Sequence, residues 1–133
     1  MKYRGPKPFE FSYPAGWTLQ EDENAVSLWK TSKGGAVTIS SVVNKDSNIR
    51  GNALEHCRRF AEKHAFDPPR LSGDSEAADA AFTDQDGAWC KARFMASGNR
   101  MVLATYNASI EDQLEEVEAD GILASPRIVP VPG

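Results

Sequence analysis

The chain has 133 residues, of which 41% are hydrophobic and 26% are charged. This length and composition are typical of one globular domain with one core, so we expect a single domain over residues 1–133. The formal net charge of −4 and the pI near 5.2 exclude the strongly basic class of proteins that bind nucleic acids or anionic lipids through general charge attraction.

The N-terminal segment predicts a strand that is buried on one face. Phe9, Phe11 and Tyr13 alternate with polar residues in "FEFSYPAGW", and a two-residue period places them on the same side of a strand. Pro14 cannot donate a backbone hydrogen bond and Gly16 favours a turn, so the chain is expected to reverse and pack Trp17 against the sheet.

Two further strands are predicted before the first helix. The polar run over residues 20–24 reads as a loop. Residues 26–31 and 37–43 are rich in β-branched and apolar side chains and are separated by Lys33, Gly34 and Gly35. This pattern predicts a hairpin, and Trp29, like Trp17, is expected in the core.

An amphipathic helix is predicted over residues 52–65. Its apolar positions include Leu54, Cys57 and Phe60, and charged residues occupy the other side. The following segment "FDPPRLSGD" contains two prolines and a glycine, so we expect a rigid loop there.

Residues 75–106 predict three antiparallel strands, with turns at "DQDG" and "SGN". A two-residue turn within residues 97–99 places Trp89, Lys91 and Arg93 on the same face as Tyr106. Cys90 and its alternate neighbours then share the opposite face.

The last predicted element is a helix over residues 110–124. Ser109 is the expected N-cap, and acidic residues in the first turn suit the helix dipole. The inner stripe is expected to be Leu114, Val117, Gly121 and Ala124, preceded by Ile110, with Gly121 allowing close approach to the sheet. Pro126 ends the helix, and residues 126–133 read as an extended tail.

The order βββαβββα and the segments "FSYPAGW", "DGAWCKARF", "NRMVLATY" and "ILASPRI" resemble the PsbP-like superfamily. That group includes Ran-binding Mog proteins, the photosystem subunit PsbP and Eag-type chaperones of type VI secretion effectors. The resemblance implies an α+β fold, with an antiparallel sheet of about six strands flanked by two helices, and a binding role without catalysis. We expect a bacterial member of this group.

The sequence offers no pattern for catalysis or for a metal. His56 and His64 are eight residues apart rather than at the i, i+4 spacing of a helical metal clamp. "DQDG" begins like a calcium loop but continues into an apolar strand without further carboxylates. Cys57 and Cys90 read as small buried hydrophobes in a reducing compartment. We therefore expect no catalytic residues, no metal and no cofactor.

No run of about eighteen apolar residues occurs, and the first residues lack the apolar segment of a secretory signal. The sequence thus predicts a cytoplasmic protein with no membrane insertion and no nucleic-acid partner.

The candidate site is a partner-binding face of aromatic and cationic side chains: Trp89, Lys91, Arg93 and Tyr106. Such residues can present an oriented, adhesive patch to a protein. The other interpretation is that a helix or the N-terminal strand covers this face, with Trp89 in the core and the cations reaching its rim.

Two functions follow from these observations. The first is a non-catalytic protein-binding module, as in an effector chaperone, an immunity protein or an adaptor, with an exposed apolar patch on the order of several hundred Å². A homodimer is possible in this class. The second is a ligand-binding or enzymatic domain with a pocket between sheet and helix, lined by Cys57, His64 and Tyr106.

Overall fold

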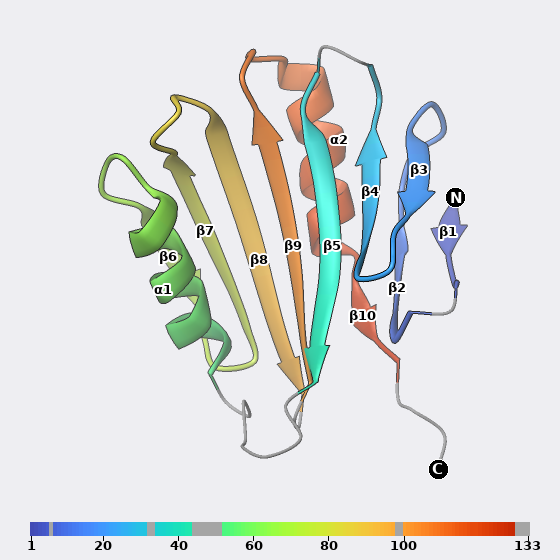
Figure 1. Ribbon diagram of the computed structural model, residues 1–133, viewed down its shortest axis with the longest axis horizontal. Helices are drawn as coiled ribbons and strands as arrows, with labels where there is room; N and C mark the ends of the chain where they lie inside the picture. The colour runs from blue at the N-terminus through green and yellow to red at the C-terminus, as the bar shows by residue number, and fades with distance from the viewer. Residues whose placement is uncertain (6, 32–33, 44–51, 98–99, 130–133) are drawn as a thin grey trace.

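The computed structural model describes residues 1–5, 7–31, 34–43, 52–97 and 100–129. Its main feature is a seven-stranded antiparallel sheet in the order β3-β4-β5-β9-β8-β7-β6 (Figure 1). In chain order its strands are β3 (Thr18–Glu21), β4 (Ala25–Trp29), β5 (Ala36–Val43), β6 (Arg70–Gly73), β7 (Ala77–Thr83), β8 (Trp89–Ser97) and β9 (Arg100–Ala108). A small sheet joins β2 (Phe9–Ser12) to β1 (Lys2–Tyr3) and β10 (Arg127–Ile128).

The two helices lie on opposite faces of the main sheet. Helix α1 (Ala53–His64) packs on β7, β8 and β6, and helix α2 (Gln113–Ala124) packs behind β9, β5 and β8 in the view of Figure 1. The small sheet lies on the α2 side, where β2 contacts α2. The main sheet is therefore the middle layer between two different coverings.

Each covering encloses its own hydrophobic cluster. On the α2 side, Phe9, Phe11 and Trp17 meet the inward side chains of β4, β5 and β9. On the α1 side, Cys57 packs with Phe82 and neighbouring side chains of β7 and β8. The even and odd positions of one strand thus supply two separate cores, as the two-residue period requires.

Several predicted elements are confirmed. The fold is α+β with a mainly antiparallel sheet, and the first helix and the three strands after it are present. Gly16 and Gly87 have the positive φ angles of 96° and 85° that turns favour. In the "DQDG" turn, the Asp84 side chain accepts hydrogen bonds from the backbone of Asp86 and Ala88, both at 2.9 Å. The other two turns extend into residues 32–33 and 98–99, outside the described residues.

Two predicted loops are wrong because they contain edge strands. β3 includes part of the polar run over residues 20–24, and β6 lies within "FDPPRLSGD". Each strand pairs on one side only, β3 with β4 and β6 with β7. Most of their side chains are exposed, so backbone pairing forms them without the apolar alternation that marks an inner strand. Within the predicted tail, Arg127 and Ile128 pair with β2, while residues 130–133 lie outside the described residues.

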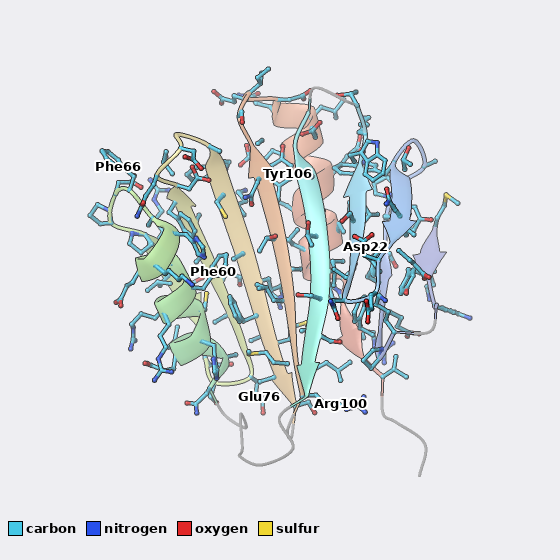
Figure 2. All side chains as sticks on the ribbon, viewed as in Figure 1. Asp22, Phe60, Phe66, Glu76, Arg100 and Tyr106 are labelled. Carbon is cyan, nitrogen blue, oxygen red and sulfur yellow. The ribbon has the colours of Figure 1, made fainter. Side chains whose placement is uncertain are left out.

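Side chains at the end of α1 show how far the covering extends. Figure 2 shows Phe66 standing away from the sheet just after α1, and its side chain is 78% exposed. Phe60, one turn before the helix ends, instead contacts Phe82 and Phe94 with ring centroids 6.1 and 5.7 Å apart. The α1 cluster therefore ends before Phe66.

Candidate functional site

The four residues predicted to form a partner-binding face do share one side of the sheet. Lys91 lies opposite Tyr106, and Arg93 lies opposite Ala104, in the pairing of β8 with β9. Trp89 and Lys91 are tied to α2: the Trp89 indole donates to Glu116 at 3.0 Å, and the Lys91 ammonium lies 2.8 Å from both Glu116 and Asp120. The helix therefore covers this part of the face.

Tyr106 and Arg93 have different surroundings. The Tyr106 side chain is 1% exposed, and its hydroxyl donates to the Glu115 carboxylate at 2.7 Å. Arg93 is half-buried and pairs with Asp79 on β7 at 3.0 Å. Tyr106 offers no surface to a partner while α2 is in place. Partner binding by the other three residues stays a prediction.

Buried polar contacts set the rotation of α2 about its axis. Glu115 is buried, and its carboxylate accepts hydrogen bonds from the Tyr106 hydroxyl and from the backbone N–H of Gly35 at 2.6 Å. On the same helix, Glu118 accepts from the Trp17 indole at 2.6 Å and from Lys30 at 2.8 Å. A carboxylate whose oxygens accept hydrogen bonds in this way can lie on the side of a helix that faces the protein interior. These contacts turn Glu115 and Glu118 toward the sheet, on the same side as the apolar Ala119 and Ile122.

The predicted inner stripe of α2 is consequently on the outside. Ile110, Leu114 and Val117 are 62%, 65% and 67% exposed, and Gly121 and Ala124 are exposed as well. The buried positions are instead Glu115, Ala119, Ile122 and Leu123. The expectation that Gly121 lies close to the sheet is wrong, since no described atom beyond its chain neighbours and the adjacent backbone of α2 lies within 4 Å of where its Cβ would be.

The predicted N-cap of α2 is also wrong. Asp112 occupies that position, with an extended backbone, and its side chain accepts from the N–H of Glu115 at 3.0 Å. Ser109 lies three residues earlier. A carboxylate is as good a cap as a hydroxyl and also suits the positive end of the helix dipole.

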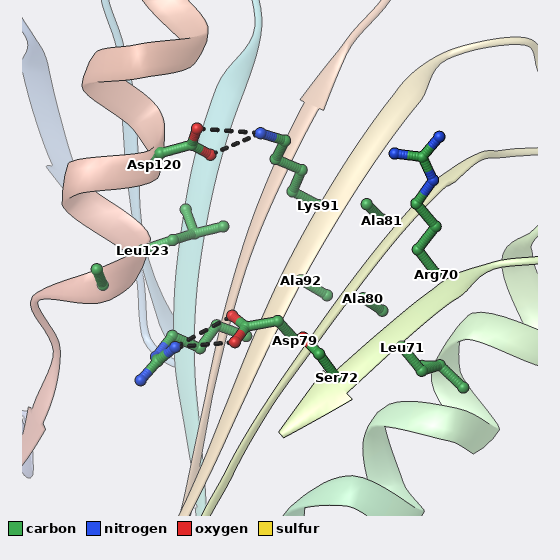
Figure 3. Close-up of a pocket in the computed structure, with 12 residues that line it drawn as sticks. Arg70, Leu71, Ser72, Asp79, Ala80, Ala81, Lys91, Ala92, Asp120 and Leu123 are labelled. Carbon is green, nitrogen blue, oxygen red and sulfur yellow. Dashed lines mark hydrogen bonds and ion pairs between the residues drawn. The ribbon is translucent and has the colours of Figure 1, made fainter. Parts of the chain in front are cut away.

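A cleft runs between α2 and strands β6 to β8, with a cavity volume of about 350 Å³. Figure 3 shows Lys91 reaching across it to Asp120, with Arg70 on the opposite wall and Leu123 on the helix side. The cleft contains charged groups of both signs, and within it the Arg93 side chain pairs with Asp79.

A second cavity of about 430 Å³ lies at the N-terminal end of α2, beside Trp89, Ile110 and Glu116. The sequence predicted a pocket between sheet and helix, but of the three predicted lining residues only Tyr106 lines one of these two cavities, the second.

The predicted pocket lined by Cys57, His64 and Tyr106 does not form. Cys57 belongs to the cluster under α1, whereas Tyr106 belongs to the cluster on the other face of the sheet, and His64 is exposed. Burial raises the pKa of the Cys57 thiol to about 11 and that of Cys90 to about 12. Both cysteines are buried and remain thiols near neutral pH.

Acid should weaken the attachment of α2. The hydrogen bond from Lys91 lowers the pKa of Glu116, and the hydrogen bond from Lys30 lowers the pKa of Glu118. Carboxyls with a lowered folded-state pKa stabilise the fold above the ordinary value of 4.5, and this stabilisation is lost as the pH falls through the folded-state pKa. Urea unfolding near pH 7 and at about pH 3 should therefore show less acid sensitivity in a Glu116→Gln, Glu118→Gln variant than in the wild type. Equal sensitivity would contradict this.

Among residues 1–5, 7–31, 34–43, 52–97 and 100–129, no three His, Cys, Asp or Glu side chains gather closely enough to hold a metal ion. In the same part of the chain, neither helix has the length and apolar character needed to cross a membrane.

The comparisons with known proteins concern the fold. A scan against protein-family models finds no match for this chain, and a search of curated proteins finds none. The solution structure of cyanobacterial PsbP (CyanoP) from Synechocystis sp. matches with 14% identity and a TM-score of 0.63, over 96% of this chain and 91% of that one. A crystal structure from Bacteroides thetaiotaomicron matches with 16% identity and a TM-score of 0.62, over 97% of this chain.

This chain spans only 48% of the Bacteroides protein's length. Identities this low carry no information about residue roles, so the likeness concerns the backbone alone. It agrees with the resemblance carried by the four quoted sequence segments: the chain has a PsbP-like fold.

Proposed function

We propose that this protein is a non-catalytic protein-binding module that holds its partner on the outer face of α2. The observation that carries the proposal is the apolar outer stripe of α2, defined as Leu114, Val117, Gly121 and Ala124, with Ile110 also exposed just before the helix. Large apolar side chains that gather on a surface mark sites of association, because burying them against a partner removes apolar area from water.

The stripe differs from the face expected from the sequence, but the two adjoin each other. Lys91 bonds to Asp120, which lies beside the stripe on α2, and Trp89 bonds to Glu116 on the same helix. In the proposal, Trp89 and Lys91 hold the helix and form the border of the binding surface, whereas Arg93 lies farther away in the cleft beside Asp79. An effector chaperone, an immunity protein or an adaptor, acting in the bacterial cytoplasm, would use such a surface.

Site-specific cross-linking in a lysate of the native host tests this function. A photo-reactive amino acid at Val117 should cross-link one main protein, and the same group at Glu62, an exposed position of α1, should not. A Leu114→Ser change added to the Val117 probe should reduce the yield several-fold, because it removes apolar contact without changing charge. Identical products from both probe positions, or none from Val117, would contradict the proposal.

A ligand-binding or enzymatic domain is the second candidate, and the cleft beside α2 is the observation that favours it. Its volume of about 350 Å³ falls in the range of small-molecule sites. Arg70 and Leu123 on opposite walls suit a small molecule with both an anionic and an apolar part. Amide NMR signals of β6 and β8 that shift with such a compound, while those of α2's outer face stay fixed, would favour this candidate.

A further inference from the structure

The outer stripe has the spacing of a helix-packing seam. Leu114, Val117, Gly121 and Ala124 follow one another at intervals of three, four and three residues. This alternation is the 3.5-residue repeat that lets one helix lie along another, and it is narrower than the stripe of a helix that faces a sheet. The surface therefore fits a partner helix better than a strand or a loop.

Gly121 supports the same interpretation. Glycine inside a helix costs about 0.5–1 kcal/mol relative to alanine, and no described atom within this chain lies close enough to require its missing Cβ. Gly121 and Ala124 have small side chains, so the C-terminal half of the stripe projects less from the helix than the half with Leu114 and Val117. A helix lying along the stripe could approach the backbone closely there and insert a large side chain over Gly121.

The borders of the stripe are acidic. Carboxylates flank it on the helix and at its N-terminal end: Glu111, Asp112, Glu116, Glu118 and Asp120. Among the described residues, the cations that contact them are Lys30 and Lys91. The five carboxylates thus outnumber the two ammonium groups by three. If two copies of the chain met at this stripe, each would present the same excess of negative charge to the other. Like charges across an interface oppose association.

We propose that the partner element is an amphipathic helix whose apolar face is bordered by Lys or Arg. The apolar face packs along the outer stripe, and the basic side chains meet the carboxylates at its borders. This inference rests on the proposed function and specifies the chemistry of the partner.

Three synthetic helical peptides of about 18 residues test the inference. They share one apolar face of Leu and Ala and differ only in the flanking residues, which are Lys, Gln or Glu. Titration calorimetry at about 0.15 M salt limits general charge attraction. We expect the Lys peptide to bind at least about tenfold more tightly than the Gln peptide, and the Glu peptide not to bind.

Two variants locate the binding. A Leu114→Ser, Val117→Ser variant keeps every charge and should lose most of the affinity for the Lys peptide. A Glu111→Gln, Asp120→Asn variant keeps the apolar side chains and should bring the affinity for the Lys peptide toward that of the Gln peptide. Thermal melting confirms that both variants remain folded.

Four results would overturn the inference. If the Gln peptide binds as tightly as the Lys peptide, the stripe docks helices without regard to charge, and the proposed function survives. If the Lys peptide binds the serine variant as well as the wild type, its binding is general charge attraction. If sedimentation shows a wild-type dimer that the serine variant loses, the occupant is a second copy. If no peptide binds while cross-linking at Val117 succeeds, the partner has another chemistry.

Discussion

Replacing the acidic residue Glu115 with alanine is expected to destabilise the protein far more than replacing either of its apolar neighbours. Glu115→Ala removes the acceptor of two buried donors, the Tyr106 hydroxyl and the Gly35 N–H. Buried donors left without partners cost about 1–3 kcal/mol each, so we expect the free energy of unfolding to fall by about 2–6 kcal/mol. Leu114→Ala and Val117→Ala change exposed positions and should alter it by less than about 0.5 kcal/mol.

Urea unfolding followed by circular dichroism measures all three variants on the same scale. Glu111→Ala is the matched control, because it removes an exposed carboxylate at the start of the same helix region. The conservative change Glu115→Gln keeps one acceptor oxygen and should recover part of the loss. A Leu114 variant that is less stable than the Glu115 variant would mean that α2 packs with its other side against the sheet.

The second large effect is expected at Phe9, in the small sheet. Its ring is fully buried and lies 5.8 Å from that of Tyr3 and 6.2 Å from that of Phe11, between centroids. Phe9→Ala leaves a cavity in the cluster that joins the small sheet to the main sheet. Truncating a buried phenylalanine costs about 3–5 kcal/mol, so we expect a loss of that size in the free energy of unfolding.

Phe66→Ala is the control for this variant, since it removes the same group from an exposed position. It should leave the unfolding midpoint almost unchanged. If Phe9→Ala is equally neutral, the small sheet contributes little to the stability of the main core and can be removed without unfolding it.

Inner strands were predictable because their side chains alternate between buried and partly exposed positions. β7 and β8 have buried residues at every second position, and the residues of β8 and β9 that share a face are those that were predicted to do so. β3 and β6 were missed because an edge strand is held by backbone bonds to a single neighbour, and its side chains need not follow any apolar pattern.

The candidate site was predictable only in part. The period of β8 and β9 correctly placed Trp89, Lys91, Arg93 and Tyr106 on one face, and one of the two interpretations, a covering helix, describes Trp89 and Tyr106. A pocket between sheet and helix was predicted, but the residues that line the cleft beside α2 could not be, because they come from β6, β7, β8 and α2, which are separate segments of the sequence. Residue patterns within one segment contain no information about which other segments will pack beside it in the fold.

The sequence by itself determined the class of fold, the two helices and the inner strands, because periods of 2 and 3.6 residues are local properties of the chain. It also placed Leu114, Val117, Gly121 and Ala124 on one stripe of α2. Only the tertiary structure decided that this stripe lies outside and that the side with Glu115, Ala119, Ile122 and Leu123 faces the sheet. The partners of Glu115 are Gly35, eighty residues earlier in the chain, and Tyr106 on β9, so its burial becomes favourable only after these strands have assembled. The apolar stripe is then left outside, where it becomes available to another molecule.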